Sequence, residues 1–249
     1  MTSLYGEHAD LYDIAFDWDV SDEAAWLEVR LGPGRPDVLE PGCGSGRILE
    51  ALARRGLSVT GIDLSPRMVE LARRRLAAAG LPGEAVEADM TDFDLGRRFG
   101  GAVCPVNTLR HLPRHALAAH LGAMHRALEP DARYLVQLGL AGDGEPPESL
   151  WRAERDGVEL RVTWTPESWD EERGVELHRS RVEILTGPRA GEVHEELHEM
   201  TVWTHAGWRE AVEAGGFEWA AVYDGVEAGR PRRGFDATGG LLWHELARR

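Results

Sequence analysis

The sequence of 249 residues contains no lysine and only two cysteines, Cys43 and Cys104. Two cysteines cannot form the disulfide framework of a small secreted domain, and a chain of this length does not need one. No stretch approaches the roughly 18 apolar residues of a membrane span, and the acidic N-terminal segment does not resemble a signal peptide. We therefore expect a cytoplasmic protein with no membrane partner.

Positive charge is also scarce. The 28 basic residues, all arginine, stand against 43 acidic residues, which gives a formal charge of −15. Such a chain repels phosphate backbones, so we expect no nucleic-acid partner unless a local arginine patch overrides the average. Arg30, Arg35 and Arg110 are candidates for binding an anionic part of a ligand, although the simpler interpretation is solvated surface arginines.

Short apolar runs alternate with helical patterns over the first 140 residues. Val38 and Leu39 form the centre of the first expected strand, and an N-terminal helical region is expected within residues 1–30. Further strands are expected at 57–63, 84–89, 100–106 and 132–138, and helices at 47–56, 65–79 and 113–130. This alternation predicts the α/β class, a parallel sheet covered by helices on both faces.

The pattern changes after residue 140. A loop is expected at 142–149, then antiparallel strands at 158–164, 175–185 and 193–203, a helix at 204–215, and strands at 217–223 and 237–246. We interpret the antiparallel part as an insertion after the fifth strand. The predicted division is residues 1–140 for the N-terminal helix and ligand-binding core, 141–203 for a lid or dimer element, and 204–249 for completion of the core.

Residues 37–47, DVLEPGCGSGR, place three alternating glycines directly after the first strand. Gly42, Gly44 and Gly46 lack a Cβ, so the chain can turn tightly and a ligand can approach the backbone at the carboxyl edge of the sheet. The spacing differs from the dinucleotide pattern G-x-G-x-x-G, and Glu40 precedes it. A buried carboxylate is unfavourable beside a pyrophosphate and favourable beside an amine or sulfonium, so the predicted ligand carries positive charge here.

Acidic residues follow the next two strands. Asp63, 17 residues beyond Gly46, can accept both hydroxyls of a ribose, and Asp89 with Met90 suits the amino group and ring of adenine. Each acid alone is more often a cap or a solvated residue. Their order along one α/β pattern makes coincidence much less credible.

The stretches VLEPGCGSGR, GIDLSPRMVELAR and EADMTDF together resemble the motifs of class I S-adenosylmethionine-dependent methyltransferases. The resemblance implies a Rossmann-like, doubly wound sheet of seven strands with the last strand antiparallel. It also implies S-adenosylmethionine as methyl donor and S-adenosylhomocysteine as product. The implied cofactor-binding residues are Tyr12, Glu40, Gly42, Cys43, Gly44, Gly46, Asp63, Leu64, Met68, Asp89, Met90 and Pro105.

The sequence is most similar to the glycine and amino-sugar N-methyltransferase type. Tyr12 and Asp13 in LYDIAF match its N-terminal Tyr-Asp pair, and the insertion matches its antiparallel element. Tyr12 would then lie over the cofactor, whereas ordinary helix packing is the alternative. The resemblance implies methyl transfer to a small polar metabolite, with nitrogen favoured over oxygen, and a homodimer is plausible. A non-catalytic S-adenosylmethionine-binding module, or another reaction on the same cofactor, remains an alternative.

The segment CPVNTLRHL follows the fourth strand, where this family places the methyl acceptor. It lacks the N/D-P-P-Y/F motif of nucleic-acid amino-methyltransferases. Asn107 and His111 are the candidate catalytic residues, since His111 could take a proton from the acceptor. Alternatively, His111 has a structural role and positioning alone is sufficient for a neutral amine. Tryptophans that could line an acceptor pocket, or form the insertion's core or a dimer surface, are Trp151, Trp164, Trp169 and Trp203.

Residues 194–198, HEELH, match the zinc-protease pattern H-E-x-x-H, which requires a helix. The neighbours of this segment favour a strand, on which His194 and His198 would lie about 13 Å apart at roughly 3.3 Å per residue. One zinc ion could hardly bind both. We therefore predict no metal site.

Overall fold

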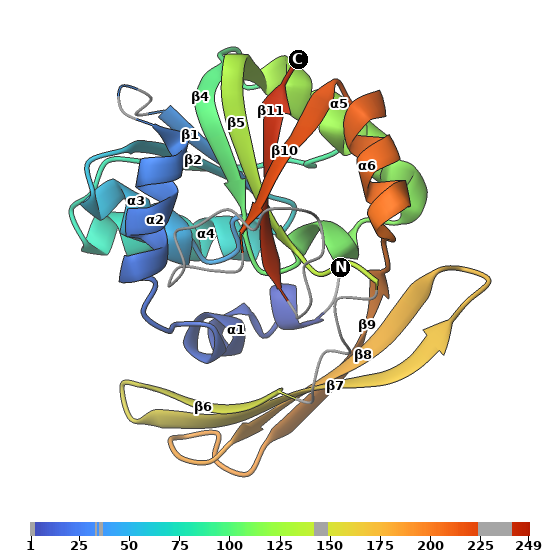
Figure 1. Ribbon diagram of the computed structural model, residues 1–249. Coiled ribbons are helices and arrows are strands. Elements are labelled where there is room, and N and C mark those ends of the chain that lie inside the picture. Colours follow the sequence, from blue (N-terminus) through green and yellow to red (C-terminus); the bar gives the residue numbers. More distant parts are fainter. Residues whose placement is uncertain (1–2, 33, 35–36, 142–148, 224–240) are drawn as a thin grey trace.

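The computed structural model describes residues 3–32, 34, 37–141, 149–223 and 241–249. Its main sheet has seven strands in the order β10-β11-β5-β4-β1-β2-β3 (Figure 1). The strands are β1 (Asp37–Pro41), β2 (Ser58–Asp63), β3 (Glu84–Glu87), β4 (Phe99–Cys104), β5 (Leu128–Leu138), β10 (Phe217–Tyr223) and β11 (Leu242–Arg248). Strands β1 to β5 pair in parallel, whereas β11 runs antiparallel to both β5 and β10. The predicted sheet with its antiparallel last strand is confirmed.

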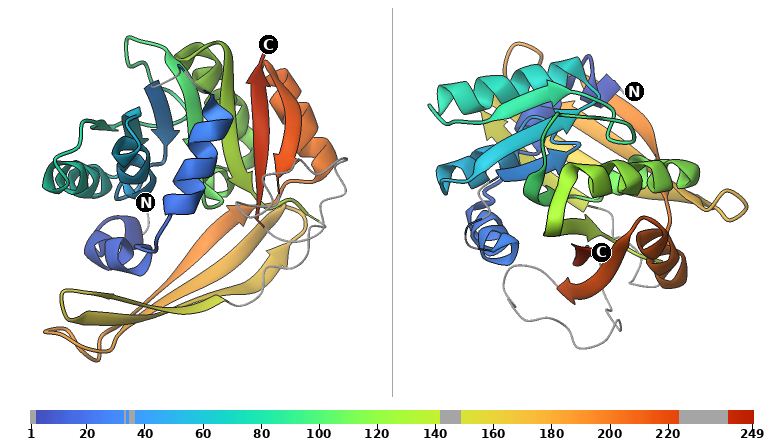
Figure 2. Two further views of the ribbon diagram at one scale, coloured as in Figure 1. Left: turned by 60° about the vertical axis from the view of Figure 1, so that its left-hand side comes forward. Right: turned by 90° about the horizontal axis from the view of Figure 1, so that it is seen from above.

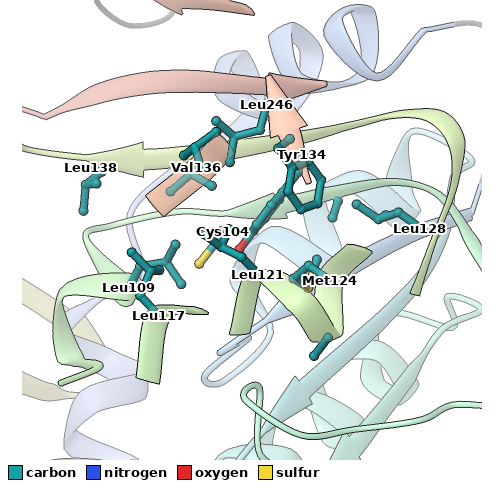
Figure 3. Packing of buried hydrophobic residues seen from close by; sticks show 14 of the residues in the cluster. Cys104, Leu109, Leu117, Leu121, Met124, Leu128, Tyr134, Val136, Leu138 and Leu246 are labelled. Atoms are coloured by element: carbon teal, nitrogen blue, oxygen red, sulfur yellow. The ribbon is translucent and has the colours of Figure 1, made fainter. Parts of the chain in front are cut away.

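Helices cover both faces of this sheet (Figures 1 and 2). One face carries α2 (Ser21–Leu31), α3 (Arg47–Arg54) and α4 (Pro66–Ala78), and the other α5 (Leu117–Ala127) and α6 (His205–Ala214). On the second face the buried side chains of α5 pack against β4 and β5 near Tyr134 and Cys104 (Figure 3). Burial of apolar side chains on both faces stabilises the sheet that positions the loops of the site.

The start of α4 shows how local sequence sets an element beside the site. Ser65 is its N-cap, with the hydroxyl oxygen accepting from the Met68 backbone N–H at 3.3 Å, and Pro66 takes the first helical position. Val69 and Leu76 lie on the buried face of the helix. The residues directly before α4 are thereby held at the carboxyl end of β2.

Four antiparallel strands form a second sheet, hereafter the inserted sheet. They are β6 (Ser149–Arg155), β7 (Val158–Asp170), β8 (Val175–Ile184) and β9 (Val193–Thr201). The sheet curves past the carboxyl ends of the core strands (Figure 1). The antiparallel insertion is confirmed, but β6 was not predicted. The register of β7 and β8 shifts between Pro166 and Ser168, which places the proline at a bulge.

The N-terminal region differs from the single helical stretch predicted. It forms a 3₁₀ helix, η1 (Ser3–Tyr5), then α1 (Ala9–Ala15), and α2 begins only at Ser21. Residues 17–19 between the two helices are exposed, and the Asp19 carboxylate accepts from the backbone N–H of Ser21 at 2.9 Å where α2 begins.

Helix α1 is attached to the core and to the inserted sheet at once. The Asp13 carboxylate accepts from Arg75 of α4 at 2.7 Å and from Arg155 of β6. The indole N–H of Trp151 on β6 donates to the Ala15 carbonyl at 2.7 Å. Because Asp13 is buried, these arginines hold the helix between the two sheets.

Some predicted boundaries are wrong. The helix predicted over 113–130 is a 3₁₀ turn at Arg114–Ala116 followed by α5, and β5 already begins at Leu128, which pairs with Phe99. Arg35 and the predicted loop and strand segments at 142–148 and 237–240 lie outside the described residues. Arg30 is partly exposed, and its guanidinium binds Glu245 at 2.6 Å. Within the described ranges, no helix is both long and apolar enough to cross a membrane.

Candidate active site

A cavity of about 1330 Å³ separates the carboxyl ends of the core strands from the inserted sheet. The core contributes Gly42 and Asp63 to its wall, α1 contributes Tyr12, and the inserted sheet contributes Trp164. One end of the cavity is thus built by the glycine loop and the other by the insertion. We call these the core end and the insertion end.

The glycine loop adopts a backbone conformation that few other residues accept. Gly42 and Gly44 have φ of +68° and +52° and line the cavity. The backbone N–H groups of Gly42 and Cys43 donate to the Ile62 carbonyl at 2.8 and 3.0 Å, which ties the loop to β2. The loop therefore presents backbone without side chains to the cavity.

Asp63, at the end of β2, lies beside this loop and lines the cavity. Its Oδ2 accepts from the Gly44 N–H at 2.9 Å, and its Oδ1 accepts from the Ser65 N–H at 2.8 Å. Burial raises the pKa of this carboxyl above its usual value. Each carboxylate oxygen keeps a further lone pair, so both can accept from a ligand.

Four more predicted cofactor-binding residues line the cavity: Leu64, Met68, Asp89 and Met90. Asp89 Oδ1 accepts from the backbone N–H and the hydroxyl of Thr91 at 2.8 and 2.7 Å. The carbonyl of Met90 lies 2.9 Å from His120 Nδ1 and is thereby fixed against α5. This wall combines a flexible apolar side chain with a fixed carboxylate.

Two tyrosines cover the core end. The Tyr12 ring lies 3.4 Å from the position that a Gly44 Cβ would take, and it stacks on Phe16 with ring centroids 4.4 Å apart. Tyr5 packs edge-on against Tyr12 at 5.4 Å, and its carbonyl accepts from the Ser65 hydroxyl. Tyr5 was not predicted, although its spacing of seven residues from Tyr12 could have suggested it.

Glu40 is buried behind the glycine loop and is not among the residues that line the cavity. Burial raises the pKa of its carboxyl well above the usual value. Within the described residues, Oε2 has no hydrogen-bond partner. Glu40 is an unsatisfied buried acceptor next to the site rather than part of the cavity wall.

Three other predicted residues also lie outside the cavity wall: Cys43, Gly46 and Pro105. Cys43 packs against Gly61 of β2, and Gly46 packs against Ala72 of α4. The Pro105 carbonyl accepts from the Thr108 hydroxyl at 2.7 Å. These residues contact the loops beside the cavity, and their assignment as cofactor-binding residues stays a prediction.

The segment after β4 is strained where it enters the cavity. Val106 and Asn107 have φ of +54° and +58°, a region that a β-branched residue rarely adopts. The Val106 N–H donates to Gln137 Oε1 at 2.8 Å, and Asn107 Oδ1 accepts from the Gly139 N–H at 2.9 Å. Asn107 therefore has a structural bond to the end of β5, and it also lines the cavity.

His111 lies in a 3₁₀ turn, η2 (Thr108–His111), and lines the cavity. Its Nε2 is 3.3 Å from the Tyr5 hydroxyl. Burial, and then the charges of His198, Arg110 and His178, lower the pKa of His111 to about 4. The ring is therefore neutral near pH 7 and is only a weak base.

Protonation of His111 should make the stability of the protein depend on pH. Its pKa is about 4 when folded and 6.5 when unfolded, so the unfolded chain binds the proton first and stability is lost as pH falls from about 6.5 towards 4. At pH 5 the loss amounts to about 2 kcal/mol. Urea unfolding at pH 7.5 and pH 5 should show this drop reduced in His111→Gln. Parallel pH dependence in both proteins would contradict it.

Three of the four tryptophans considered line the insertion end: Trp151, Trp164 and Trp169. Trp164 stacks on His198 with ring centroids 4.5 Å apart. Trp203 is instead buried against the core, with the Arg114 guanidinium 4.6 Å from its ring centroid. The pocket-wall interpretation holds for three residues and the core interpretation for Trp203.

A polar network at the insertion end was not predicted. Arg110 is 6% exposed, so the expectation of a solvated arginine is wrong. Its Nε donates to the Thr201 carbonyl at 3.0 Å, and its Nη2 donates to Glu176 at 2.5 Å. Glu176 also contacts His178 at 3.0 Å. The alternation of Glu176 and His178 on an expected strand was the available signal, because such residues share a face.

The HEELH segment lies on β9, as predicted from its neighbours. His198 faces inward and contacts the Ser180 hydroxyl at 2.8 Å, whereas His194 contacts Glu192 at 3.1 Å. The helical arrangement that a zinc protease requires is absent from this described strand.

Sequence comparisons identify the family. Residues 38–131 match a family model described as a methyltransferase domain. The chain is 32% identical over 222 residues to dTDP-3-amino-3,6-dideoxy-alpha-D-glucopyranose N,N-dimethyltransferase of Streptomyces fradiae, covering 85% of this chain and 84% of that protein. The chain belongs to the class I S-adenosylmethionine-dependent methyltransferases. Its resemblance to the sugar N-methyltransferase type is confirmed, and its methyl donor is S-adenosylmethionine.

Solved structures show the same fold as this methyltransferase. The CcbJ methyltransferase of Streptomyces caelestis is 22% identical, with a TM-score of 0.75 and coverage of 98% of each chain. CalS10, an amino pentose methyltransferase of Micromonospora echinaspora, is 24% identical with a TM-score of 0.71, covering 98% of this chain and 97% of that one. The agreement extends over the inserted sheet, since both matches span nearly the whole chain.

Proposed function

We propose that this methyltransferase methylates the amino group of a small amino sugar. Full-length similarity to an amino-sugar N,N-dimethyltransferase supports this class of acceptor. The observation that carries the assignment is the composition of the insertion end. Among the described residues lining the cavity, Arg110 is the sole arginine, and Glu176 binds it at 2.5 Å. That end therefore suits an acceptor that carries a cationic amine.

Residues of the core end fit S-adenosylmethionine. The two oxygens of Asp63 would accept from the ribose hydroxyls, Asp89 and Met90 would contact the adenine, and Gly42 and Gly44 would approach the methionine part. The free lone pairs of Asp63 support this assignment. Burial favours the neutral acid of Glu40, and a bound cation beside its unpartnered Oε2 would favour the ionised form instead. We further propose that Tyr12 covers the cofactor.

The bound cofactor supplies a methyl group on a positively charged sulfur. The chain's part is to align the acceptor with that methyl group and to exclude water. The rigid turn at Asn107, held to β5, would set the wall at which the two ligands meet. The inserted sheet would serve as the lid over the acceptor.

The titratable groups at this wall favour nitrogen over oxygen as acceptor atom. A sugar hydroxyl needs a base to become a good nucleophile, whereas a neutral amine already carries a reactive lone pair. His111 is a weak base, with its pKa at about 4. Burial raises the pKa of Tyr5 and Tyr12, so both remain protonated and cannot act as bases near neutral pH. His111 would orient the acceptor more than it would deprotonate it.

A panel of matched acceptors tests the proposed function. It contains dTDP-3-amino-3,6-dideoxyglucose, the methyl glycoside of the same amino sugar, and dTDP-6-deoxyglucose, which has a hydroxyl in place of the amine. Mass spectrometry with S-adenosylmethionine should show one or two added methyl groups on an amine and none on the hydroxyl compound. Methylation of the hydroxyl compound alone, or tight cofactor binding with no amine methylated, would contradict the proposal.

A further inference from the structure

Glu176 lies at the insertion end on the inward face of the inserted sheet. Inward residues of β8 alternate as His178, Ser180, Val182 and Ile184, and Glu176 continues this series. Its cross-strand partners are Trp169 on β7 and Met200 on β9, and all three line the cavity. The carboxylate therefore faces the cavity between an aromatic ring and a thioether.

One oxygen of this carboxylate is fixed. Oε2 accepts from Arg110 at 2.5 Å and lies 3.0 Å from His178 Nε2. The Trp164 indole N–H donates to His178 Nδ1 at 3.1 Å, so the proton of the neutral ring is on Nε2 and points at Glu176. Among the described residues, the hydrogen bonds and ion pairs of the Glu176 carboxylate are made through Oε2. The carboxylate is oriented through one oxygen and keeps the other available.

The surroundings of Oε1 suit an alkylammonium group. Trp169 is half exposed directly across the strand pair, and Trp164 lies on the same side of the cavity. A carboxylate beside aromatic faces recognises a substituted ammonium through a charged hydrogen bond and cation–π attraction. A hydroxyl would gain much less from the same groups.

We propose that Glu176 binds the amino group of the methyl acceptor, with Trp169 against its carbon substituents. This assignment rests on the proposed function and names the residue that selects an amine. On arrival the ammonium loses one proton to solvent. The nitrogen lone pair then forms the N–C bond, the C–S bond breaks with its electron pair going to sulfur, and the positive charge passes from sulfur to nitrogen. Glu176 stabilises that charge where it develops.

The ionisation of Glu176 supports this role. The hydrogen bond from His178 is the largest effect on the pKa of Glu176 and lowers it. Burial acts in the opposite direction, but the bond from Arg110 lowers the pKa further, to about 2. The carboxylate is therefore charged before, during and after transfer. It cannot serve as the proton acceptor, which separates its role from general base catalysis.

Binding of matched ligands to Glu176→Gln tests the assignment. Protein saturated with S-adenosylhomocysteine is titrated calorimetrically with dTDP-3-amino-3,6-dideoxyglucose or with dTDP-6-deoxyglucose. The methyl glycosides of 3-amino-3,6-dideoxyglucose and of 6-deoxyglucose are compared in the same way. The variant should bind the amine about 10- to 100-fold more weakly, which is the loss expected for a charged hydrogen bond. Its affinity for the hydroxyl compound should not change. Glu176→Asp should recover part of the loss.

Glu195→Gln is the matched control. Glu195 is on β9 of the same sheet and forms ion pairs with Arg179 and Arg181, but it does not line the cavity. It should leave both ligands unaffected. Equal weakening of both ligands by Glu176→Gln would mean that Glu176 only attaches β8 to η2, and no weakening of either would also overturn the assignment.

Failure of the proposed function has a different signature. If the unaltered protein neither binds nor methylates any amine in the panel, the amine-acceptor function is wrong and the assignment of Glu176 is lost with it. If the unaltered protein methylates an amine and Glu176→Gln binds it equally well, the function stands and only the role of Glu176 is overturned.

Discussion

Asp63→Ala should weaken S-adenosylmethionine binding by about 100-fold or more. The carboxylate would accept two ribose hydroxyls, and each hydrogen bond to a charged group contributes about 1.5–3 kcal/mol. The substitution also releases the Gly44 and Ser65 N–H groups, which Asp63 holds at 2.9 and 2.8 Å. The glycine loop then loses one of its bonds to β2, whereas the bonds from Gly42 and Cys43 to the Ile62 carbonyl remain. Calorimetric titration with S-adenosylmethionine and with S-adenosylhomocysteine measures the effect.

Asp94→Ala is the control for this experiment. Asp94 also accepts from the backbone N–H two residues ahead, that of Gly96, at 2.8 Å, but it lies outside the cavity. Both substitutions thus remove a carboxylate that caps a turn, and only one removes a ligand contact. Unchanged affinity in Asp63→Ala, in a folded protein, would refute the placement of the ribose.

Gly46→Ala should destabilise the fold by about 2–5 kcal/mol. Gly46 has φ of +84°, which costs an L-residue about 1–2 kcal/mol. A Cβ there would lie 2.9 Å from the Cβ and 3.0 Å from the Cα of Ala72, and overpacking against a helix backbone adds about 1–3 kcal/mol. Urea unfolding with and without S-adenosylhomocysteine would show the loss in both states.

Gly56→Ala isolates the backbone part of that effect. Gly56 has φ of +86° at the other end of α3, and a Cβ there would meet no atom within 4 Å. We expect a loss of about 1–2 kcal/mol from conformation alone. Equal losses of unfolding free energy in Gly46→Ala and Gly56→Ala would show that α4 moves to accommodate the added methyl group. Close packing against α4 would then not explain why residue 46 is a glycine.

The core was predictable because its signals are local. Ser65 and Pro66 mark the start of α4, and the apolar spacing of Val69 and Leu76 marks its buried face. The start of β5 was missed because Leu128 enters the strand by pairing with Phe99, a contact that the helical pattern before it does not reveal.

The core end of the cavity was predictable for a topological reason. Gly44, Asp63 and Asp89 each lie at or just beyond the carboxyl end of a strand, and the carboxyl ends of adjacent parallel strands lie at the same edge of a sheet. Glu40 lies within β1 and is buried outside the cavity wall, so its predicted contact with the cofactor stays a prediction.

The insertion end could not be predicted in the same way. Arg110 and Glu176 are separated by 66 residues, and their contact depends on how the inserted sheet curves over the core. The register shift at Pro166 further obscures which residues of β7 face inward. Polar groups in such a sheet look like surface residues until the opposing layer is known.

The double attachment of Asp13 has a consequence for the order of events in a catalytic cycle. Asp13 joins Arg75 of the core to Arg155 of the inserted sheet, and its neighbour Tyr12 covers the core end. Displacing α1 would therefore uncover the cofactor and loosen the acceptor lid in one movement. If binding of the donor holds α1 in this position and thereby raises the affinity for the acceptor, binding of the acceptor must raise the affinity for the donor by the same factor. Donor and acceptor would then communicate through Asp13 and Asp17, two carboxylates that bind the same two arginines and do not line the cavity.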